Sequence, residues 1–233
     1  MRADSKRSAF IIGNTGKLGE ELLNVLLESA LYSKVHVGVR REMRSQVSKL
    51  VPVVVPAVRA GWNPFAGMAA APEDLYLCIE PDAKSFWKIA KPYVAVTSEW
   101  AVPLARGMRA AGARRVAVIT PLEALLQIGT APVIRDNDEL AILEAGFERM
   151  LVLRPVAEGA SPSPTGFFGK LGGVVTRTLG SYMTPAALQP VRVRRVAQVA
   201  VETLATMGDG VQIMGAARLR ELVGDPMDDR RRF

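Results

Sequence analysis

Three glycines near the amino terminus are spaced for binding a phosphate group. Gly13, Gly16 and Gly19 follow the apolar run 9–12 and open a stretch of helical periodicity that extends to Ser29. Such a loop lets the chain turn sharply off a strand, lets a pyrophosphate approach the backbone, and lets the helix pack closely on the strand. The helix N-terminus then directs unpaired N–H groups and a positive dipole end at the phosphates. We therefore expect dinucleotide contacts from Gly13, Asn14, Thr15, Gly16, Lys17, Leu18 and Gly19.

Two arginines stand where such a site would hold the adenosine ribose. Arg40 and Arg41 follow the alternating stretch 34–39, at the distance of about 20 residues from the glycine loop where an acidic residue binds the ribose hydroxyls of NAD. Guanidinium groups at this place suit a 2′-phosphate instead, so we expect NADP(H) to be preferred over NAD(H). The alternative is that the two arginines form only the solvated end of a strand.

Other kinds of reactive site find little support in the sequence. His36 is the only histidine and falls within a predicted strand, so neither a histidine-based metal site nor a Ser-His-Asp triad can be assembled. The single cysteine, Cys78, lies in the apolar run 75–79 and is expected to be a buried thiol. Asp136, Asp138 and Glu139 could imitate a cation site, but the first turn of a helix explains them better, and no metal site is predicted.

Composition indicates a globular protein of ordinary character. The chain has 233 residues, of which 49% are hydrophobic and 23% charged, as in a typical globular domain. No apolar run reaches the roughly 18 residues that a membrane span requires. Nothing indicates secretion, and we expect an intracellular protein, either cytoplasmic or mitochondrial.

The basic charge of the chain has two interpretations. The net charge is +7, which would suit a polyanionic neighbour such as RNA or an acidic protein surface. The arginines available for such a contact are Arg192, Arg194, Arg195 and those at 230–232. The other interpretation is solubility, because aromatic residues are not interleaved with the basic ones as stacking platforms would be.

Strands alternate with helices along most of the chain. We expect strands at 9–12, 34–39, 51–56, 74–79, 114–120, 150–153 and 211–214, and helices at 16–29, 82–91, 93–111, 136–145, 167–179 and 193–207. This order predicts an α/β fold, a Rossmann-type doubly wound parallel sheet with helices on both faces. We expect one domain over 1–233, with a core at about 8–155, a C-terminal substrate or partner lobe at about 156–224 and a charged tail at 225–233.

The chain resembles the atypical short-chain dehydrogenase/reductases, and it looks closest to the Tat-interacting-protein-like and NmrA-like NAD(P)-binding proteins. The resemblance covers nearly the whole chain. It is carried by GNTGKLG at 13–19, LYSKVHVGVRRE at 31–42, LVLRP at 151–155 and QPVRVRRVAQVAVETL at 189–204. It implies NADP(H) as the cofactor.

The catalytic residues of that family are missing from this sequence. The family uses a Tyr as proton donor and a Lys four residues later; counting back from Arg154 puts these positions at Ala131 and Arg135. No Tyr-x-x-x-Lys occurs anywhere in the chain, although Thr120 could still offer a hydroxyl at the end of the fifth strand. Loss of a positioned general acid removes about 10² to 10⁴ in rate, so we expect that the usual dehydrogenase activity has been lost.

Glu80 is a second departure, because the family has a small residue there, lining the cofactor cleft. A carboxylate near the pyrophosphate would be repulsive unless it turned away or paired with a cation. Three functions remain open. The first is an NADP(H)-binding accessory, structural or redox-sensing subunit of a larger assembly. The second is an active NADPH-dependent oxidoreductase for carbonyls or quinones with a non-standard proton donor, and the third is a basic RNA-associated or assembly protein.

Overall fold

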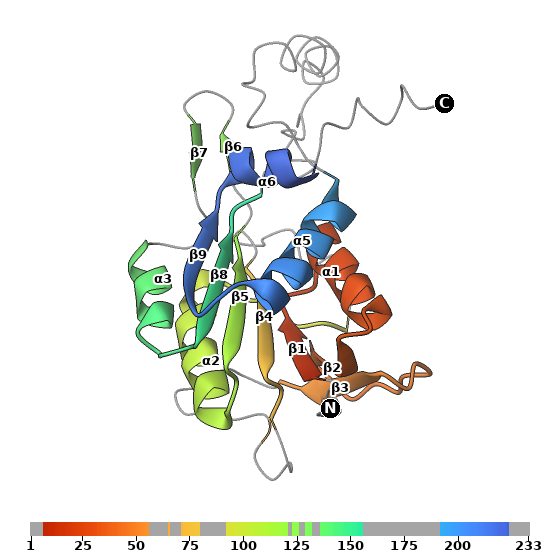
Figure 1. Ribbon diagram of the computed structural model, residues 1–233. Helices are drawn as coiled ribbons and strands as arrows, with labels where there is room; N and C mark the ends of the chain where they lie inside the picture. The colour runs from red at the N-terminus through yellow and green to blue at the C-terminus, as the bar shows by residue number, and fades with distance from the viewer. Residues whose placement is uncertain are drawn as a thin grey trace, which may run out of the picture.

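A seven-stranded parallel sheet forms the centre of the molecule (Figure 1). The structure, a computed structural model, describes residues 7–55, 65, 71–79, 92–120, 123–125, 129–131, 136–155 and 192–223. The strand order is β3-β2-β1-β4-β5-β8-β9, and every neighbouring pair is parallel. The strands are β1 (Arg7–Ile12), β2 (Tyr32–Val39), β3 (Leu50–Val54), β4 (Asp74–Cys78), β5 (Arg115–Ile119), β8 (Arg149–Leu153) and β9 (Gly210–Met214).

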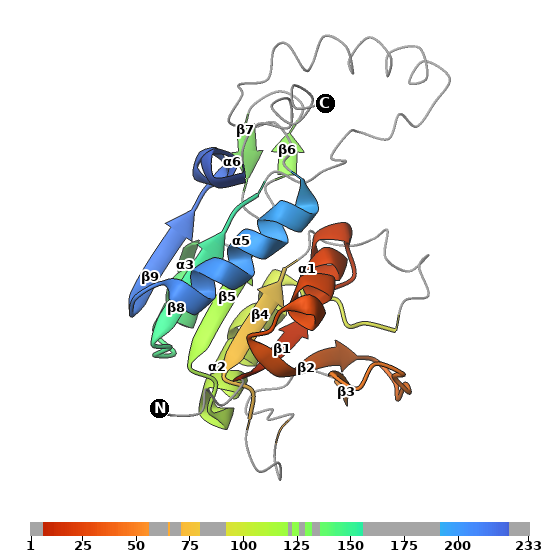
Figure 2. The ribbon, with the colours of Figure 1, turned by 45° about the vertical axis from the view of Figure 1, so that its right-hand side comes forward.

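Helices cover both faces of this sheet. Figure 2 shows α1 (Lys17–Glu28) and α5 (Val193–Thr206) side by side on one face, where their apolar residues share one core cluster. On the opposite face, α2 (Ser98–Ala111) and α3 (Asp136–Leu143) contribute to a second cluster. The remaining elements are α6 (Ala216–Val223), which contacts α5, and an antiparallel pair, β6 (Glu123–Leu125) with β7 (Gly129–Ala131).

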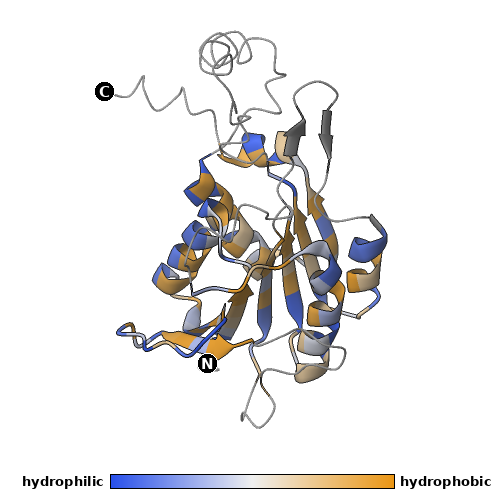
Figure 3. Ribbon diagram, turned by 180° about the vertical axis from the view of Figure 1, so that it is seen from behind, coloured by the Kyte–Doolittle hydropathy of each residue, from blue (hydrophilic) through white to orange (hydrophobic). Residues whose placement is uncertain are grey.

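The central strands are apolar on both sides because each side faces a layer of helices. All five residues of β4 and of β5 are buried. Successive residues of β1 alternate between the two clusters, with Ile11 on the α1 face and Phe10 on the α2 face, as the pleat of a strand requires. Figure 3 shows the apolar colouring of the sheet from behind.

The predicted fold class is confirmed. The seven predicted strands correspond to β1, β2, β3, β4, β5, β8 and β9, with ends shifted by at most two residues. The helices predicted at 16–29, 136–145 and 193–207 are α1, α3 and α5. The β6–β7 pair and α6 were not predicted from the sequence, and all three elements are short. The helices expected at 82–91 and 167–179 lie outside the described residues.

The helix predicted at 93–111 is wrong in its first turn. It begins only at Ser98, and the residues before it are extended. Tyr93 forms an antiparallel bridge with Val39 of β2, and Val96 forms a parallel bridge with Ile79 after β4. Backbone groups that a helix would use internally are therefore bonded to the ends of strands.

Part of the expected C-terminal lobe belongs to the central layers. Within 156–224, β9 joins the sheet beside β8, and α5 packs on α1. Residues 156–191 of the expected lobe and the tail at 225–233 lie outside the described residues, so that division of the chain stays a prediction. Among the helices that the structure describes, none is long and apolar enough to span a membrane.

Candidate functional site

The glycine loop connects β1 to α1, and two of its glycines are required by the packing. Gly13 has φ +86°, and a Cβ there would lie 1.8 Å from the carbonyl oxygen of Cys78. A Cβ on Gly19 would lie 2.5 Å from the Cα of Asn14. Gly16 differs, because its φ of −95° and ψ of 173° are extended values that any residue adopts. The backbone conformation therefore does not require glycine at position 16. Because Gly16 has no side chain, the space in front of the first turn of α1 is not occupied by one.

The two ends of α1 differ in whether a side chain binds their free backbone groups. At the carboxyl end, the ammonium of Lys49 donates to the carbonyl oxygens of Leu26 at 2.9 Å, Leu27 at 2.8 Å and Ser29 at 2.6 Å. At the amino end, Gly16 provides no side-chain cap. A cation thus complements the negative end of the helix dipole, and the positive end can receive an anion.

Asn14 is the most unusual residue of the loop. Its side chain is fully buried, yet neither the amide oxygen nor the amide nitrogen has a hydrogen-bond partner among the described residues. Leaving a buried polar group unpaired costs about 1–3 kcal/mol, and such groups call for a functional or ligand-linked explanation. Of the other predicted contacts, Thr15 is buried, Lys17 is exposed and Leu18 packs against the core.

The predicted arginine pair lies at the same edge of the sheet as the glycine loop. Ile11 of β1 is paired in register with Val37 of β2, so the loop and Arg40 both lie just beyond the carboxyl ends of neighbouring strands. Arg40 and Arg41 are exposed, and within the described part of the chain neither guanidinium forms an ion pair with a carboxylate. Both charges are available to an anionic ligand.

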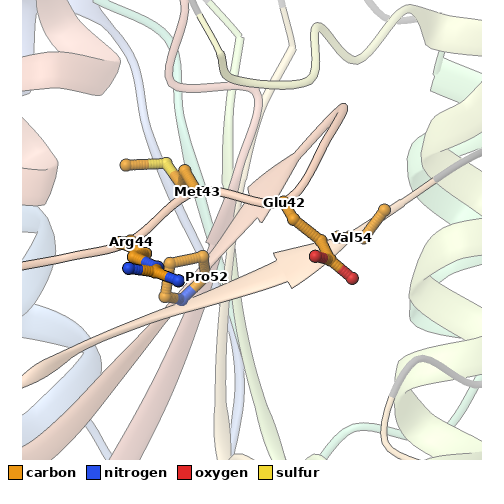
Figure 4. Close-up of a pocket in the computed structure, with 5 residues that line it drawn as sticks. All are labelled: Glu42, Met43, Arg44, Pro52 and Val54. Atoms are coloured by element: carbon orange, nitrogen blue, oxygen red, sulfur yellow. The ribbon is translucent and has the colours of Figure 1, made fainter.

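A pocket of about 350 Å³ is lined in part by the residues that directly follow this arginine pair in the sequence (Figure 4). Its lining comes from the segment that follows β2 and from β3, and consists of Glu42, Met43, Arg44, Pro52 and Val54. Residues 40–49 connect β2 to β3 without a helix, whereas each βαβ unit of a Rossmann half carries one. The pocket therefore combines apolar and charged groups at a sheet edge that no crossover helix between β2 and β3 covers.

Residues 92–96, which we call the crossing segment, run over the carboxyl ends of the strands, where a helix had been expected. The amide nitrogen of Arg40 donates to the carbonyl oxygen of Pro92 at 2.8 Å. The amide nitrogen of Val94 donates to the carbonyl oxygen of Gly38 at 3.1 Å. The crossing segment is thereby fixed to the end of β2.

The crossing segment is also bonded to the glycine loop and to β4. The amide nitrogen of Gly13 donates to the carbonyl oxygen of Val94 at 3.1 Å, and Val96 bridges Ile79. Its path therefore passes from β2 over β1 to β4. Val94 and Val96, which are β-branched, were weak signals for an extended conformation.

The region expected to hold the catalytic groups is arranged differently from the family pattern. Thr120 is fully buried; its amide nitrogen donates to the carbonyl oxygen of Leu153 at 2.9 Å, and its hydroxyl reaches the same oxygen only at 3.5 Å. Ala131, at the family's Tyr position, belongs to strand β7 rather than to a helix. Arg135 and Glu80 lie outside the described residues.

Near Thr120, an ion pair joins α3 to the end of β8. The guanidinium of Arg154 contacts the carboxylate of buried Glu139 at 2.5 Å. This contact gives Glu139 a structural partner, in keeping with its interpretation as a residue of a helix first turn. In the part of the chain that the structure describes, no group of three His, Cys, Asp or Glu side chains is placed to hold a metal ion.

At the opposite edge, three strands, β2, β4 and β5, hold a buried polar network that the sequence did not reveal. The hydroxyl of Tyr32 donates to Asp74 at 2.7 Å and lies 2.8 Å from the hydroxyl of Tyr76. Arg115 binds Asp74 through Nε, and its Nη2 lies 2.7 Å from Glu73. Burial raises the pKa of both tyrosines well above the usual value, so both remain neutral donors. Burial also raises the pKa of Asp74, while Tyr32 and Arg115 oppose that shift.

One of the arginines considered for an RNA contact forms ion pairs inside the protein. Arg194 lies 2.6 Å from Glu28 and 3.6 Å from Glu21 of α1, so its charge is engaged within the protein. The arginines at 230–232 lie outside the described residues.

Comparison with known proteins supports the fold through structures alone. No protein-family model matches the sequence, and no curated protein is significantly similar to it. Among solved structures, a short chain dehydrogenase from Burkholderia cenocepacia in complex with NADP has a TM-score of 0.54 at 17% identity, covering 98% of this chain and 95% of that one.

Two further structures extend the likeness. WbmH of Bordetella bronchiseptica, in complex with NAD+, has a TM-score of 0.53 at 12% identity, covering 90% of this chain and 75% of its own. The PhqB reductase domain from Penicillium fellutanum has a TM-score of 0.54 at 14% identity, covering 90% of this chain and 67% of its own. The chain therefore has the Rossmann-type α/β fold found in short-chain dehydrogenase and reductase structures.

Proposed function

We propose that this protein binds NADP(H) between the glycine loop and the arginine pair. The observation that carries the proposal is at the start of α1, where Gly16 provides no side-chain cap and the buried amide of Asn14 has no hydrogen-bond partner among the described residues. The neighbouring structures with bound NAD+ or NADP agree with a dinucleotide as the ligand.

Each part of the site has a separate task in this proposal. The N–H groups at the start of α1 would bind the pyrophosphate, and the exposed Lys17 would add a positive charge beside it. Arg40 and Arg41 would bind the 2′-phosphate, since guanidinium groups recognise phosphate oxygens with paired hydrogen bonds. The nicotinamide ring, when bound, supplies hydride transfer.

We further propose that the protein acts as an accessory, structural or redox-sensing subunit of a larger intracellular assembly rather than as an ordinary reductase. The sequence contains no Tyr-x-x-x-Lys, and the hydroxyl of Thr120 is buried instead of facing a cleft. Dinucleotide binding would then serve stability or sensing, because a ligand at 100 times its dissociation constant stabilises the folded state by about 2.7 kcal/mol.

Calorimetry with NADPH and NADH on the full chain tests the binding site. We expect NADPH to bind more tightly than NADH, and Arg40→Ala/Arg41→Ala to weaken NADPH binding by at least about tenfold while leaving NADH almost unchanged. Arg106→Ala, which removes an exposed arginine from α2, is the matched control. Failure of both cofactors to bind, or equal loss for NADPH and NADH, would contradict the proposed site.

Turnover assays separate the accessory role from the remaining enzymatic alternative. With NADPH bound, we expect no sustained oxidation of the cofactor by simple carbonyl or quinone acceptors. Steady turnover that Arg40→Ala/Arg41→Ala reduces in parallel with binding would identify an active oxidoreductase that uses a different proton donor.

A further inference from the structure

The position of the dinucleotide crevice follows from the order of the strands. From β1 the sheet continues through β2 to β3, and from β4 it continues in the opposite direction through β5 to β8. In open α/β sheets, ligands bind outside the carboxyl ends of the strands at such a switch point. The crevice of this protein must therefore lie over the ends of β1 and β4.

The crossing segment lies at this same place. Val94 stands between two strand ends, accepting a hydrogen bond from Gly13 after β1 and donating one to Gly38 of β2, each at 3.1 Å. Two residues later, Val96 bridges Ile79 at the end of β4. Backbone of the protein itself thus connects the two sides of the switch point.

Side chains of the crossing segment are also packed into the core. Val94 is 4% exposed and Val96 is 0% exposed, and both belong to the core cluster between the sheet and α2. Tyr93 packs against the cluster on the α1 side. Apolar contacts on both faces therefore stabilise the crossing segment where it lies.

This placement conflicts with one half of a bound dinucleotide. The adenosine ribose belongs between the glycine loop and the end of the second strand. The crossing segment occupies this place, because Pro92 is hydrogen-bonded to Arg40 and Val94 is hydrogen-bonded to Gly13. The exposed Lys17 at the start of α1 is not part of this contact.

We propose that the crossing segment is an autoinhibitory strap that closes the adenosine half of the crevice, and that NADP(H) binds by displacing it. The inference rests on the proposed function. The observed affinity for NADP(H) is then the product of the intrinsic affinity and the fraction of molecules in which the strap is open. Any contact that loosens the strap, such as a partner in an assembly, then raises the affinity for the cofactor.

Val94→Ala tests the strap by removing two buried methyl groups from its centre. Because only the closed form uses these groups, we expect the dissociation constants of NADPH and of 2′,5′-ADP to fall about tenfold. Nicotinamide mononucleotide, which lacks the adenosine half, should show no such gain. Val116→Ala is the matched control, since it truncates a fully buried valine of the same core cluster in β5, and it should leave all three affinities unchanged.

Hydrogen exchange of single amides in the unaltered protein gives a second measurement. The Val94 amide, bonded to Gly38 in the closed form, should be protected in the free protein and exchange faster with saturating NADPH. The strap proposal would be contradicted if NADPH left the exchange protection of the Val94 amide unchanged. It would also be contradicted if Val94→Ala raised the affinity for nicotinamide mononucleotide as much as the affinity for 2′,5′-ADP. Equal NADPH affinity of Val94→Ala and the parent would also overturn it while leaving the proposed function standing. No binding by either protein would overturn both.

Discussion

The two edges of the parallel sheet differ in how their buried polar groups are partnered. At the amino edge, Tyr32, Asp74, Tyr76 and Arg115 bond to one another and have little need of water or ligand. At the carboxyl edge, the buried amide of Asn14 has no partner among the described residues. Both edges bury polar groups, but only one satisfies them internally.

This difference separates groups that hold the fold from groups that await a ligand. A buried hydrogen-bond network that is fully satisfied specifies one arrangement of the strands. A buried group without a partner reduces stability unless something binds to it. Substitutions in the amino-edge network should therefore lower stability and leave NADPH binding intact. Substitutions of the carboxyl-edge groups that await a ligand should weaken NADPH binding and leave stability nearly unchanged.

Asp74→Ala should give the largest effect. It removes the acceptor shared by Tyr32 and Arg115 and leaves a buried guanidinium with only Glu73 as counter-ion. Breaking a buried pair in this way costs about 3–5 kcal/mol. Urea unfolding should report that loss, and the affinity of the remaining folded protein for NADPH should be unchanged.

Tyr76→Phe provides a graded control at the same edge, because it deletes one hydroxyl and keeps the ring. A loss of about 1 kcal/mol is expected. The contrast between the two edges would fail if Asp74→Ala cost less than this variant, or if it weakened NADPH binding as strongly as the arginine substitutions do.

His36 offers an intermediate case in the middle of β2. Burial lowers the pKa of His36 to about 4, and the charge of Lys34 adds to the shift. In the unfolded chain the pKa is about 6.5, so as the pH falls the unfolded state takes up the proton first. The free energy of unfolding should therefore decrease by about 3 kcal/mol between pH 6.5 and pH 4 and change little from this source below pH 4.

His36→Leu isolates this contribution in parallel urea titrations at several pH values. The variant should be as stable as the parent at pH 7, where the parent's histidine is neutral, and should lack the additional loss in acid. The raised pKa of Asp74 acts in the opposite direction in both proteins, so it cancels in the difference. Parallel pH profiles would show that His36 takes up its proton as easily in the folded state as in the unfolded one.

What could be predicted from the sequence depended on how local the signal was. The loop at Gly13, Gly16 and Gly19 sits within one strand-turn-helix unit, so its spacing was enough to place it. Arg40 could be placed because parallel strands end at the same edge. Both predictions needed only the identity of neighbouring elements.

The features that were missed depend on contacts between distant segments. Tyr32 and Asp74 are separated by 42 positions, and their hydrogen bond follows only once β2 and β4 are known to flank β1. The crossing segment has the same origin, because Val94 is extended through bonds to Gly13 and Gly38 rather than through its own neighbours. One helix was expected from Tyr93 to Ala111, but over residues 93–96 the bonds to the strand ends hold the chain extended instead.

Asn14→Ala should have the smallest effect on stability, and that effect should have the opposite sign to Asp74→Ala. Removing a buried amide that lacks partners relieves a desolvation cost of about 1–3 kcal/mol, and the lost packing of the short side chain offsets part of that gain. We expect the free energy of unfolding to stay level or rise by about 1 kcal/mol, while the affinity for NADPH falls. Calorimetry and urea unfolding on one preparation measure both. A variant that lost stability and kept its affinity would show that Asn14 supports the loop, and the distinction between the two edges would then rest on the arginine pair alone.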